Sequence, residues 1–143
     1  MKKTFFTFVW LWWTVVLCAQ TDSTAFRAHL YNQEYQVALR INLYEQDITV
    51  PGQEVFGQMA GYLSKEGTSY CWLIVSADME SETRARLVMS NDYGSEDLEA
   101  ELTRQNDSIY VLKRLNGSVL KVPNKGKWQK LPTILHFKRK KMR

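Results

Sequence analysis

Short segments in which apolar and polar residues alternate, each ended by a turn signal, repeat from Glu34 to the end of this chain. A period of two places successive side chains on opposite faces of an extended backbone, so each segment is typical of a half-buried strand. The clearest alternation runs over residues 36–43, where every second residue is Val, Leu or Ile. We expect eight strands, at residues 36–43, 55–63, 70–77, 84–90, 98–103, 108–115, 119–122 and 134–138.

The connections between these segments are short and carry turn residues. Pro51-Gly52 breaks the chain after the first segment. Asn116-Gly117 predicts a two-residue hairpin, because both central residues of a type I′ turn need positive φ. No segment has a helical apolar stripe of the length that a parallel crossover needs. The sequence therefore predicts an all-β fold, an eight-stranded antiparallel meander.

Two segments leave their secondary structure open. Residues 97–104 also suit a short helix because of their Glu and Ala content, and residues 24–33 suit either a strand or one helical turn. An eight-stranded meander hides its edges by closing into an up-and-down barrel or by folding into a two-sheet sandwich. The near-uniform short connections favour the closed barrel, since a Greek-key sandwich needs at least one long crossover.

In strand number, strand length and connection order, residues 34–139 resemble the calycin-type barrels, which include lipocalin-like, avidin-like and small exported inhibitor barrels. The resemblance is one of architecture. The Gly-x-Trp motif that opens the first strand of lipocalins is absent, because the corresponding stretch reads Gln36-Val37-Ala38-Leu39. No family site residue is therefore transferred to this chain, and ligand binding inside the barrel enters only by analogy.

The N-terminus has the organisation of an export signal. Lys2 and Lys3 precede an apolar run at residues 5–17, which is shorter than the roughly twenty residues that span a bilayer. We expect a signal peptide at residues 1–19, cleaved after Ala19, and a periplasmic or secreted product that is not transmembrane once processed. A lipid anchor on Cys18 is the rival interpretation, although Leu17 stands where Gly, Ala or Ser normally precedes the modified cysteine.

After processing, the chain is expected to have a lead-in segment at residues 20–33, one barrel domain at 34–139 and a basic tail at 140–143. The signal removes two basic residues, so 17 basic and 15 acidic side chains leave a net charge near +2. These charges are segregated. Residues 78–107 hold nine acidic and three basic side chains, whereas residues 108–143 hold eleven basic and none acidic.

Two interpretations of this segregation stay open. Neighbouring hairpins of opposite charge can pair across the barrel, or a basic face can meet an anionic envelope component, such as lipopolysaccharide or an acidic glycan, or an acidic protein. Nucleic acid is not expected as a partner because export places the domain where little of it is present. The candidate basic face consists of Lys113, Arg114, Lys121, Lys125, Lys127 and Lys130.

The catalytic inventory predicts no enzyme, no cofactor and no metal site. His29 and His136, the two histidines, lie 107 positions apart, and neither belongs to a known catalytic or metal-binding motif. Residues 91–97 are rich in oxygen ligands but lack the spacing of an EF-hand, so they are interpreted as a turn. Cys71 lies in an apolar segment and is interpreted as a small core residue.

An eight-stranded barrel has an interior that is either packed solid or able to hold one small ligand. Our first hypothesis is a non-enzymatic exported domain that binds a small apolar or amphiphilic molecule there. The second is an interaction or inhibitor module that acts through its loops, such as Pro51-Gly52 and residues 91–97, or its basic face. A hydrolase that uses loop carboxylates is the third. The candidate lining residues are the aromatic side chains Tyr70, Trp72, Trp128 and Phe137.

Overall fold

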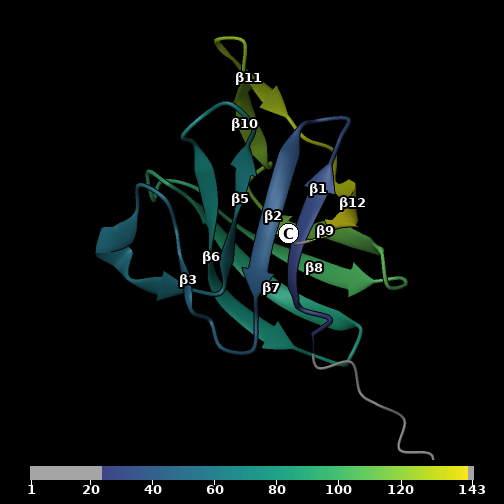
Figure 1. Ribbon diagram of the computed structural model, residues 1–143. Coiled ribbons are helices and arrows are strands. Elements are labelled where there is room, and N and C mark those ends of the chain that lie inside the picture. The colour runs from purple at the N-terminus through teal and green to yellow at the C-terminus, as the bar shows by residue number, and fades with distance from the viewer. Residues whose placement is uncertain (1–23, 142–143) are drawn as a thin grey trace, which may run out of the picture.

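Eight antiparallel strands close into a barrel in the computed structural model, which describes residues 24–141 (Figure 1). The expected signal peptide, Cys18 and the last two residues of the basic tail lie outside the described residues. The barrel strands are β1 (Arg27–Asn32), β2 (Val37–Asn42), β5 (Gly61–Lys65), β6 (Cys71–Met79), β7 (Arg84–Asn91), β8 (Asp97–Arg104), β9 (Ile109–Gly117) and β12 (Ile134–Lys140).

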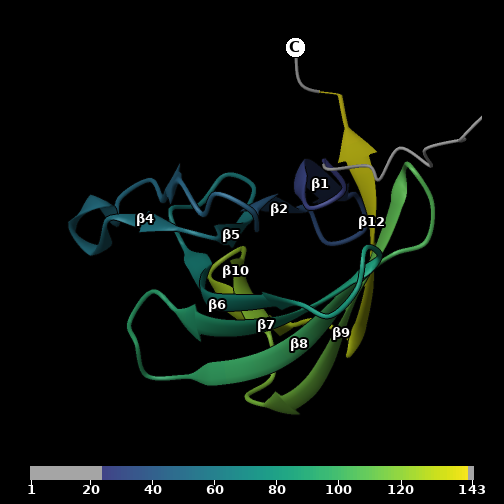
Figure 2. The same ribbon diagram turned by 90° about the horizontal axis from the view of Figure 1, so that it is seen from below.

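Each barrel strand pairs with the barrel strands that precede and follow it along the chain, and β12 closes the ring on β1. The expected up-and-down barrel is confirmed, and the two-sheet sandwich is excluded. Viewed along the barrel, β7, β8 and β9 form a curved wall opposite β1 and β2 (Figure 2). No helix in the described part of the chain is long and apolar enough to cross a membrane.

Two excursions leave the barrel wall. The first, between β2 and β5, contains β3 (Ile48–Thr49), the 3₁₀ turn η1 (Glu54–Phe56) and β4 (Gln58–Met59). The second, between β9 and β12, is the hairpin of β10 (Lys121–Asn124) and β11 (Lys127–Lys130), which extends beyond the end of the barrel in Figure 1. Each excursion is a small two-stranded sheet of its own.

The expected number of barrel strands is correct, but their assignment is wrong in part. The segment 55–63 is not one strand, because it is divided between η1, β4 and the start of β5, with Gly57 at positive φ between η1 and β4. The segment 119–122 becomes β10, which pairs only with β11, and the missing barrel strand is β1 in the expected lead-in segment. Ala28, Leu30 and Asn32 alternate as the buried residues of β1. The polar Asn32 and the outward Tyr31 obscure this pattern in the sequence. Residues 97–104 form a strand throughout rather than a helix.

The hairpin predicted at Asn116-Gly117 is wrong. β9 continues through Gly117, which pairs with Leu98, and a bulge at Leu115 separates this pair from the rest of the ladder. Gly117 has φ 90°, and a Cβ atom there would lie 2.5 Å from the backbone oxygen of Asp97. The glycine therefore permits a bulge and a close backbone approach between β8 and β9 rather than a tight turn.

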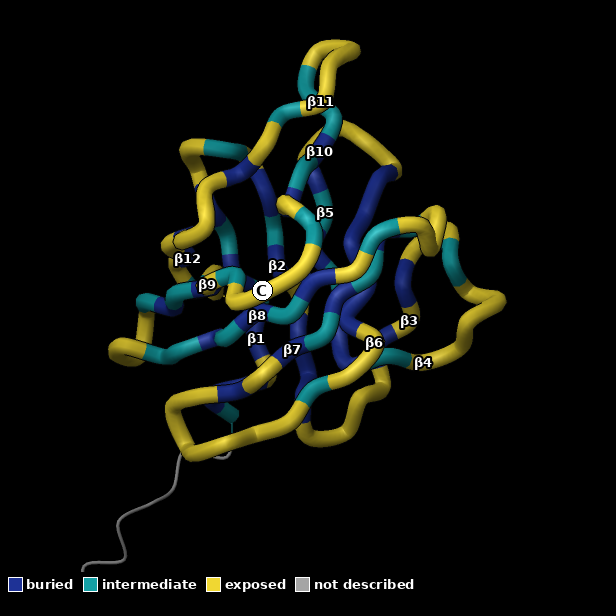
Figure 3. Tube along the Cα trace, turned by 180° about the vertical axis from the view of Figure 1, so that it is seen from behind, coloured by how far each residue is buried: buried dark blue, intermediate teal, exposed yellow. Residues whose placement is uncertain are grey.

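Alternation along the strands fills the interior of the barrel. The largest side chains with no more than trace exposure include Phe26, Trp72, Tyr110 and Phe137. Buried segments follow the barrel strands, whereas the connecting loops and the tip of the β10–β11 hairpin are exposed (Figure 3). The strand at 70–77 was expected to be apolar on both faces, and β6 shows this arrangement, with Trp72 in the interior and Leu73 in a separate outer cluster.

The outer cluster explains the environment of Cys71. Cys71 and Leu73 lie beneath Val50, which the first excursion brings against the outside of β6. Burial, with a smaller contribution from the nearby Asp92 carboxylate, raises the pKa of the Cys71 thiol to about 11. Cys71 is therefore a small apolar packing residue in this fold, in agreement with its sequence interpretation.

Candidate functional site

The four aromatic residues expected to line a ligand cavity lie in two different environments. Trp72 and Phe137 have no exposed surface and belong to the packed interior, and Tyr70 is 6% exposed near the end of the barrel. Trp128 lies on β11 and is 52% exposed. The fold therefore does not bring these side chains around one cavity.

The interior of the described barrel leaves little free volume. A cavity between Leu98, Ala100, Leu112, Leu120 and Leu135 measures about 10 Å³, which is close to the space that one water molecule needs. Small-molecule pockets typically measure about 300–1,000 Å³. The small interior residues Ala85 and Ala100 leave no open space beside them, because they are 0% and 1% exposed within this packing.

The β10–β11 hairpin is tied to the barrel by the core. The indole Nε1 of Trp72 donates a hydrogen bond of 2.9 Å to the carbonyl oxygen of Lys121, the first residue of β10. The base of the hairpin is closed by a hydrogen bond of 2.8 Å from the backbone nitrogen of Leu131 to the oxygen of Leu120. Val122 on the inner face of the hairpin is fully buried. The hairpin is therefore an ordered projection.

The outer face of this hairpin carries aromatic and basic side chains together. The register places Lys121 opposite Lys130 and Pro123 opposite Trp128, and alternation puts these four residues on one face. Trp128 packs edge-to-face on Tyr70, with ring centroids 5.0 Å apart, and Tyr70 contacts Tyr93 at 5.9 Å. We name this set the aromatic–lysine surface: Tyr70, Tyr93, Lys121, Trp128 and Lys130.

Lys121 connects the charges and the rings of this surface. Its ammonium group lies 5.6 Å from the centroid of the Trp128 ring and 3.2 Å from a carboxylate oxygen of Glu96. A cation over an indole face is held by the ring quadrupole. This arrangement fixes the exposed Trp128 between a lysine and a buried tyrosine, so its ring is presented to solvent in a defined orientation.

Three oxygen atoms near this surface are buried and make no hydrogen bond of regular geometry: the hydroxyl of Tyr70, Oδ1 of Asp92 and Oε1 of Gln129. Burial, with a smaller contribution from the Asp92 carboxylate, raises the pKa of Tyr70 to about 12. Burial also raises the pKa of Asp92. The titratable groups of Tyr70 and Asp92 therefore lie beneath the exposed rings, shielded from solvent.

The expected basic face is divided by the fold. Lys121, Lys125, Lys127 and Lys130 are together on the β10–β11 hairpin, whereas Lys113 and Arg114 are on β9.

The two β9 residues have local roles. Lys113 is opposite Glu101 of β8, and Glu101 is opposite Arg86 of β7, so opposite charges alternate across this part of the wall. Arg114 donates a hydrogen bond of 3.0 Å to the backbone oxygen of Gly117. Opposite charges therefore pair across strands β7 to β9. The hairpin instead carries a cluster of lysines, of which Lys121 contacts Glu96.

Tyr93 and Glu96 are members of this region that sequence reasoning did not identify individually. They lie in the β7–β8 connection, residues 91–97, which was expected to be a turn and a candidate contact loop. Asn91 organises this connection, because its Oδ1 accepts hydrogen bonds from the backbone nitrogens of Ser95 (2.9 Å) and Glu96 (3.2 Å). The turn is confirmed, and it carries Tyr93 to the same end of the barrel as Trp128.

The two histidines lie on neighbouring strands but do not meet. The register places His29 of β1 opposite Lys140 of β12. His136 lies four residues before Lys140 on β12, and four residues span about 13 Å along a strand. Within residues 24–141, no group of three or more His, Cys, Asp or Glu side chains is arranged to hold a metal ion. Comparisons of the chain with protein-family models, with curated proteins and with solved structures found no match.

Proposed function

We propose that this chain is an exported, non-enzymatic interaction module that presents its aromatic–lysine surface to an acidic protein. The observation that carries the proposal is Trp128, half exposed on an ordered projection and packed on the buried Tyr70. Trp and Tyr are enriched at the centres of protein interfaces, where a few residues contribute most of the binding energy.

The charge of the hairpin supports an acidic partner. The hairpin carries four lysines, Lys121, Lys125, Lys127 and Lys130, of which Lys121 and Lys130 share the face of Trp128. Residues 108–141 contain no acidic side chain. Complementary charge at the rim of an interface accelerates association and selects against wrong partners. An aromatic centre with a basic rim is the arrangement expected for an acidic protein surface.

The packed interior supports this function over a ligand held inside the barrel. A small apolar molecule would need far more room than the cavity of about 10 Å³ between the interior strands. The closed up-and-down barrel is compatible with calycin-type architecture, and we include in the proposal that the chain belongs among exported barrels of that type that act through their surface. Export itself rests on the expected signal at residues 1–19.

The test is capture of a partner from envelope extracts of the host, with the protein expressed as its full-length precursor. We compare the wild type with Trp128→Ala and with Val55→Ala, which removes an 88% exposed apolar side chain from the other excursion. One acidic protein should bind the wild type and Val55→Ala alike, and Trp128→Ala should weaken that binding roughly tenfold or more. Raising the salt from about 50 to about 300 mM should also weaken it.

Equal capture by all three proteins would overturn the role of the aromatic–lysine surface. Native mass spectrometry of the same wild-type preparation gives a second decision. A co-purifying small molecule that leaves on denaturation would move the function into the barrel and contradict the proposal.

A further inference from the structure

Three basic side chains from three strands form one row on the outer wall of the barrel, away from the hairpin. The register places His29 of β1 directly opposite Arg40 of β2 on one side and Lys140 of β12 on the other. His29 points outward, because its strand neighbours Ala28 and Leu30 are buried in the core. Directly opposed side chains lie about 5 Å apart at Cβ. We name His29, Arg40 and Lys140 the cationic row.

The row is not neutralised by its own surroundings. The carboxylates that lie near it are engaged elsewhere: Glu45 pairs with Arg27 at 3.6 Å, Asp47 accepts a hydrogen bond of 3.0 Å from Asn42, and Glu66 accepts one of 2.7 Å from Tyr31. No ion pair in the described part of the chain joins a member of the row to an acidic side chain. Protonation of His29 would place like charges directly opposite each other, which is unfavourable in a sheet, so a bound anion would stabilise the fully charged row.

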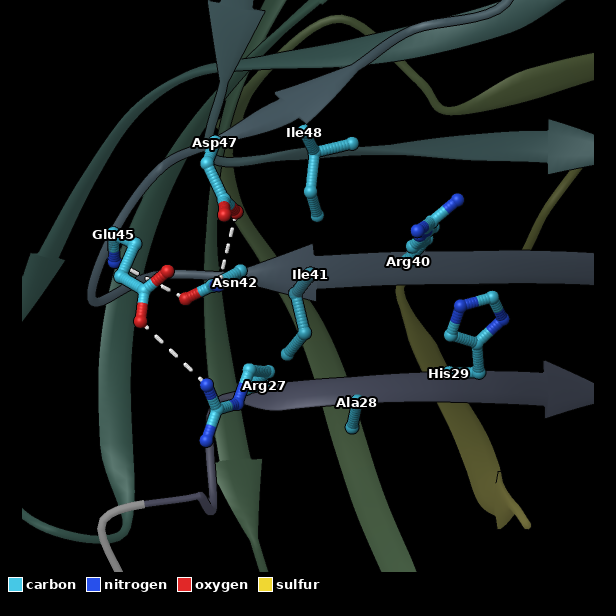
Figure 4. Close-up of a pocket in the computed structure, with 9 residues that line it drawn as sticks. All are labelled: Arg27, Ala28, His29, Arg40, Ile41, Asn42, Glu45, Asp47 and Ile48. Atoms are coloured by element: carbon cyan, nitrogen blue, oxygen red, sulfur yellow. Dashed lines mark hydrogen bonds and ion pairs between the residues drawn. The ribbon is translucent and has the colours of Figure 1, made fainter. Parts of the chain in front are cut away.

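A groove lies on each side of β1, and His29 lines both. The first, of about 220 Å³, is bounded by β1, β2 and the loop that carries Glu45 and Asp47. Figure 4 shows His29 and Arg40 side by side at one end of it, with the Arg27–Glu45 ion pair at the other. The second groove, of about 530 Å³, has no acidic residue among the described side chains that line it: Thr24, Arg27, Ala28, His29, Arg139, Lys140 and Lys141.

Two of the basic groups in the larger groove are held in place. Arg139 donates a hydrogen bond of 2.8 Å to the backbone oxygen of Thr24, and the ammonium group of Lys140 lies 4.4 Å from the centroid of the Tyr31 ring. Tyr31 in turn donates a hydrogen bond of 2.7 Å from its hydroxyl to Glu66. The position of Lys140 beside His29 is therefore supported from β1, which favours a preorganised charge over a freely moving one.

We propose that the cationic row binds a phosphate monoester group, with the remainder of the ligand in the groove toward Lys141. A phosphate monoester carries nearly two negative charges at neutral pH and three acceptor oxygens. It can meet the Arg40 guanidinium, the His29 ring and the Lys140 ammonium at once. This site lies on different strands from the aromatic–lysine surface and does not depend on it.

Binding at this site should be coupled to protonation of His29. Partial burial lowers the pKa of His29, and the positive charges of Arg40 and then Lys140 lower it further. The other charged groups that line the two grooves with it are the Arg27–Glu45 ion pair, the engaged Asp47, and Arg139 and Lys141 of the larger groove. A bound dianion reverses the local field and favours the imidazolium. Affinity for the dianion should therefore decline as the pH rises through the pKa of His29 in the complex, and at low pH it should decline again as the phosphate, whose second pKa is about 6, takes up a proton.

The test is an NMR titration of the full protein with inorganic phosphate and with glycerol phosphate, followed at the His29 ring and at the amides of β1 and β12. Arg40→Gln and Lys140→Gln should each weaken binding about fivefold or more. His29→Gln should remove the decline in affinity at higher pH and leave only the pH dependence that comes from protonation of the phosphate itself. Lys113→Gln is the matched control, because Lys113 is an outward lysine opposite Glu101 on another part of the wall; it should bind as the wild type does.

Folding of the variants is measured alongside binding. Phosphate should raise the melting temperature of the wild type and of Lys113→Gln, and should raise that of Arg40→Gln much less. Shifts that spread over the hairpin lysines and are unchanged by Arg40→Gln would show general attraction of anions and would overturn the site.

The source of the phosphate is resolved with vesicles. Vesicles of phosphatidylcholine with about 30% phosphatidic acid present the same monoester on a surface. Binding to these vesicles that is lost in Arg40→Gln assigns a lipid headgroup, and binding of glycerol phosphate alone assigns a small phosphorylated molecule. Failure of all three probes at millimolar concentration would refute the proposal.

Discussion

The indole nitrogen of Trp72, inside the barrel, donates its hydrogen bond to the carbonyl oxygen of Lys121, at the base of the exposed hairpin, over 2.9 Å. The two residues are 49 positions apart in the chain. Through this bond a fully buried side chain sets the position of the strand that carries the basic face. The packing of the core and the presentation of Trp128 are thereby connected.

Trp72→Phe should loosen the hairpin more than the barrel. The substitution leaves the Lys121 carbonyl without its donor and opens space in the core, so we expect a loss of about 2 kcal/mol or more in the free energy of unfolding. Hydrogen exchange should show a larger loss of protection over residues 121–130 than over β7. Phe137→Leu, which removes buried volume from β12 without a hydrogen bond, is the control. Equal loss of protection in both variants would show that the bond does not hold the hairpin.

Ala85→Val should destabilise the barrel because the interior is filled. Ala85 is fully buried among core side chains, whereas Ala38 lies on the outer side of β2 opposite Tyr31. We expect Ala85→Val to cost about 1–3 kcal/mol by urea unfolding and Ala38→Val to change stability by less than about 0.5 kcal/mol. An Ala85→Val variant as stable as the wild type would reveal unfilled space inside the barrel.

Gly117→Ala should be more damaging than Gly126→Ala, although both glycines have positive φ. A Cβ atom added at position 117 would lie 2.5 Å from the Asp97 backbone oxygen and 2.8 Å from the Leu98 Cα atom. A Cβ atom added at position 126 would have no neighbouring atom within 4 Å. We expect Gly126→Ala to lower the free energy of unfolding by about 1 kcal/mol, from backbone conformation alone. Gly117→Ala should lower it by at least twice as much. Thermal unfolding of the two variants measures the difference. Similar melting temperatures would contradict the close approach of β8 and β9.

Tyr70→Phe should be tolerated at pH 7 and should protect the protein at high pH. The Tyr70 hydroxyl has no regular hydrogen bond to lose. Its pKa is raised from 10.0 to about 12 by burial and by Asp92, so between these values the unfolded chain loses a proton that the native state keeps. The native state therefore has its full stability with respect to Tyr70 below pH 10, and it loses stability relative to the unfolded chain as the pH rises from 10 toward 12. The same reasoning applies to Cys71 between pH 9.0 and about 11.

The measurement for this prediction is the melting temperature as a function of pH. The slope between pH 10 and 12 should be shallower for Tyr70→Phe than for the wild type. Tyr93→Phe, which removes a hydroxyl from a 73% exposed side chain, should follow the wild type. A slope that does not change in Tyr70→Phe would show that Tyr70 does not govern alkaline unfolding.

Local pattern in the sequence was sufficient for the fold class. The alternation in β2, β7 and β8 identifies strands because a side-chain period of two follows from the extended backbone itself. Short connections then favoured a closed meander. The apolar run of β6 also indicated that both of its faces are covered, as Trp72 and Leu73 show. The basic character of residues 121–130 was visible in the same way.

Local pattern was not sufficient where distant segments decide the outcome. Asn116-Gly117 has the composition of a tight hairpin, but contact with Asp97 and Leu98 places Gly117 in a bulged strand. Trp72 and Trp128 both lie on strands, yet one fills the interior and the other is half exposed, because β11 leaves the barrel wall.

The sequence alone determined that this chain forms antiparallel strands with a segregated charge, since strand periodicity and charge content are properties of neighbouring residues. Tertiary structure decided which strands close the barrel, how completely its interior is filled and which basic residues meet. His29, Arg40 and Lys140 form a row only because β12 returns to pair with β1. Such pairing depends on the burial of all eight strands at once, and no single segment encodes it.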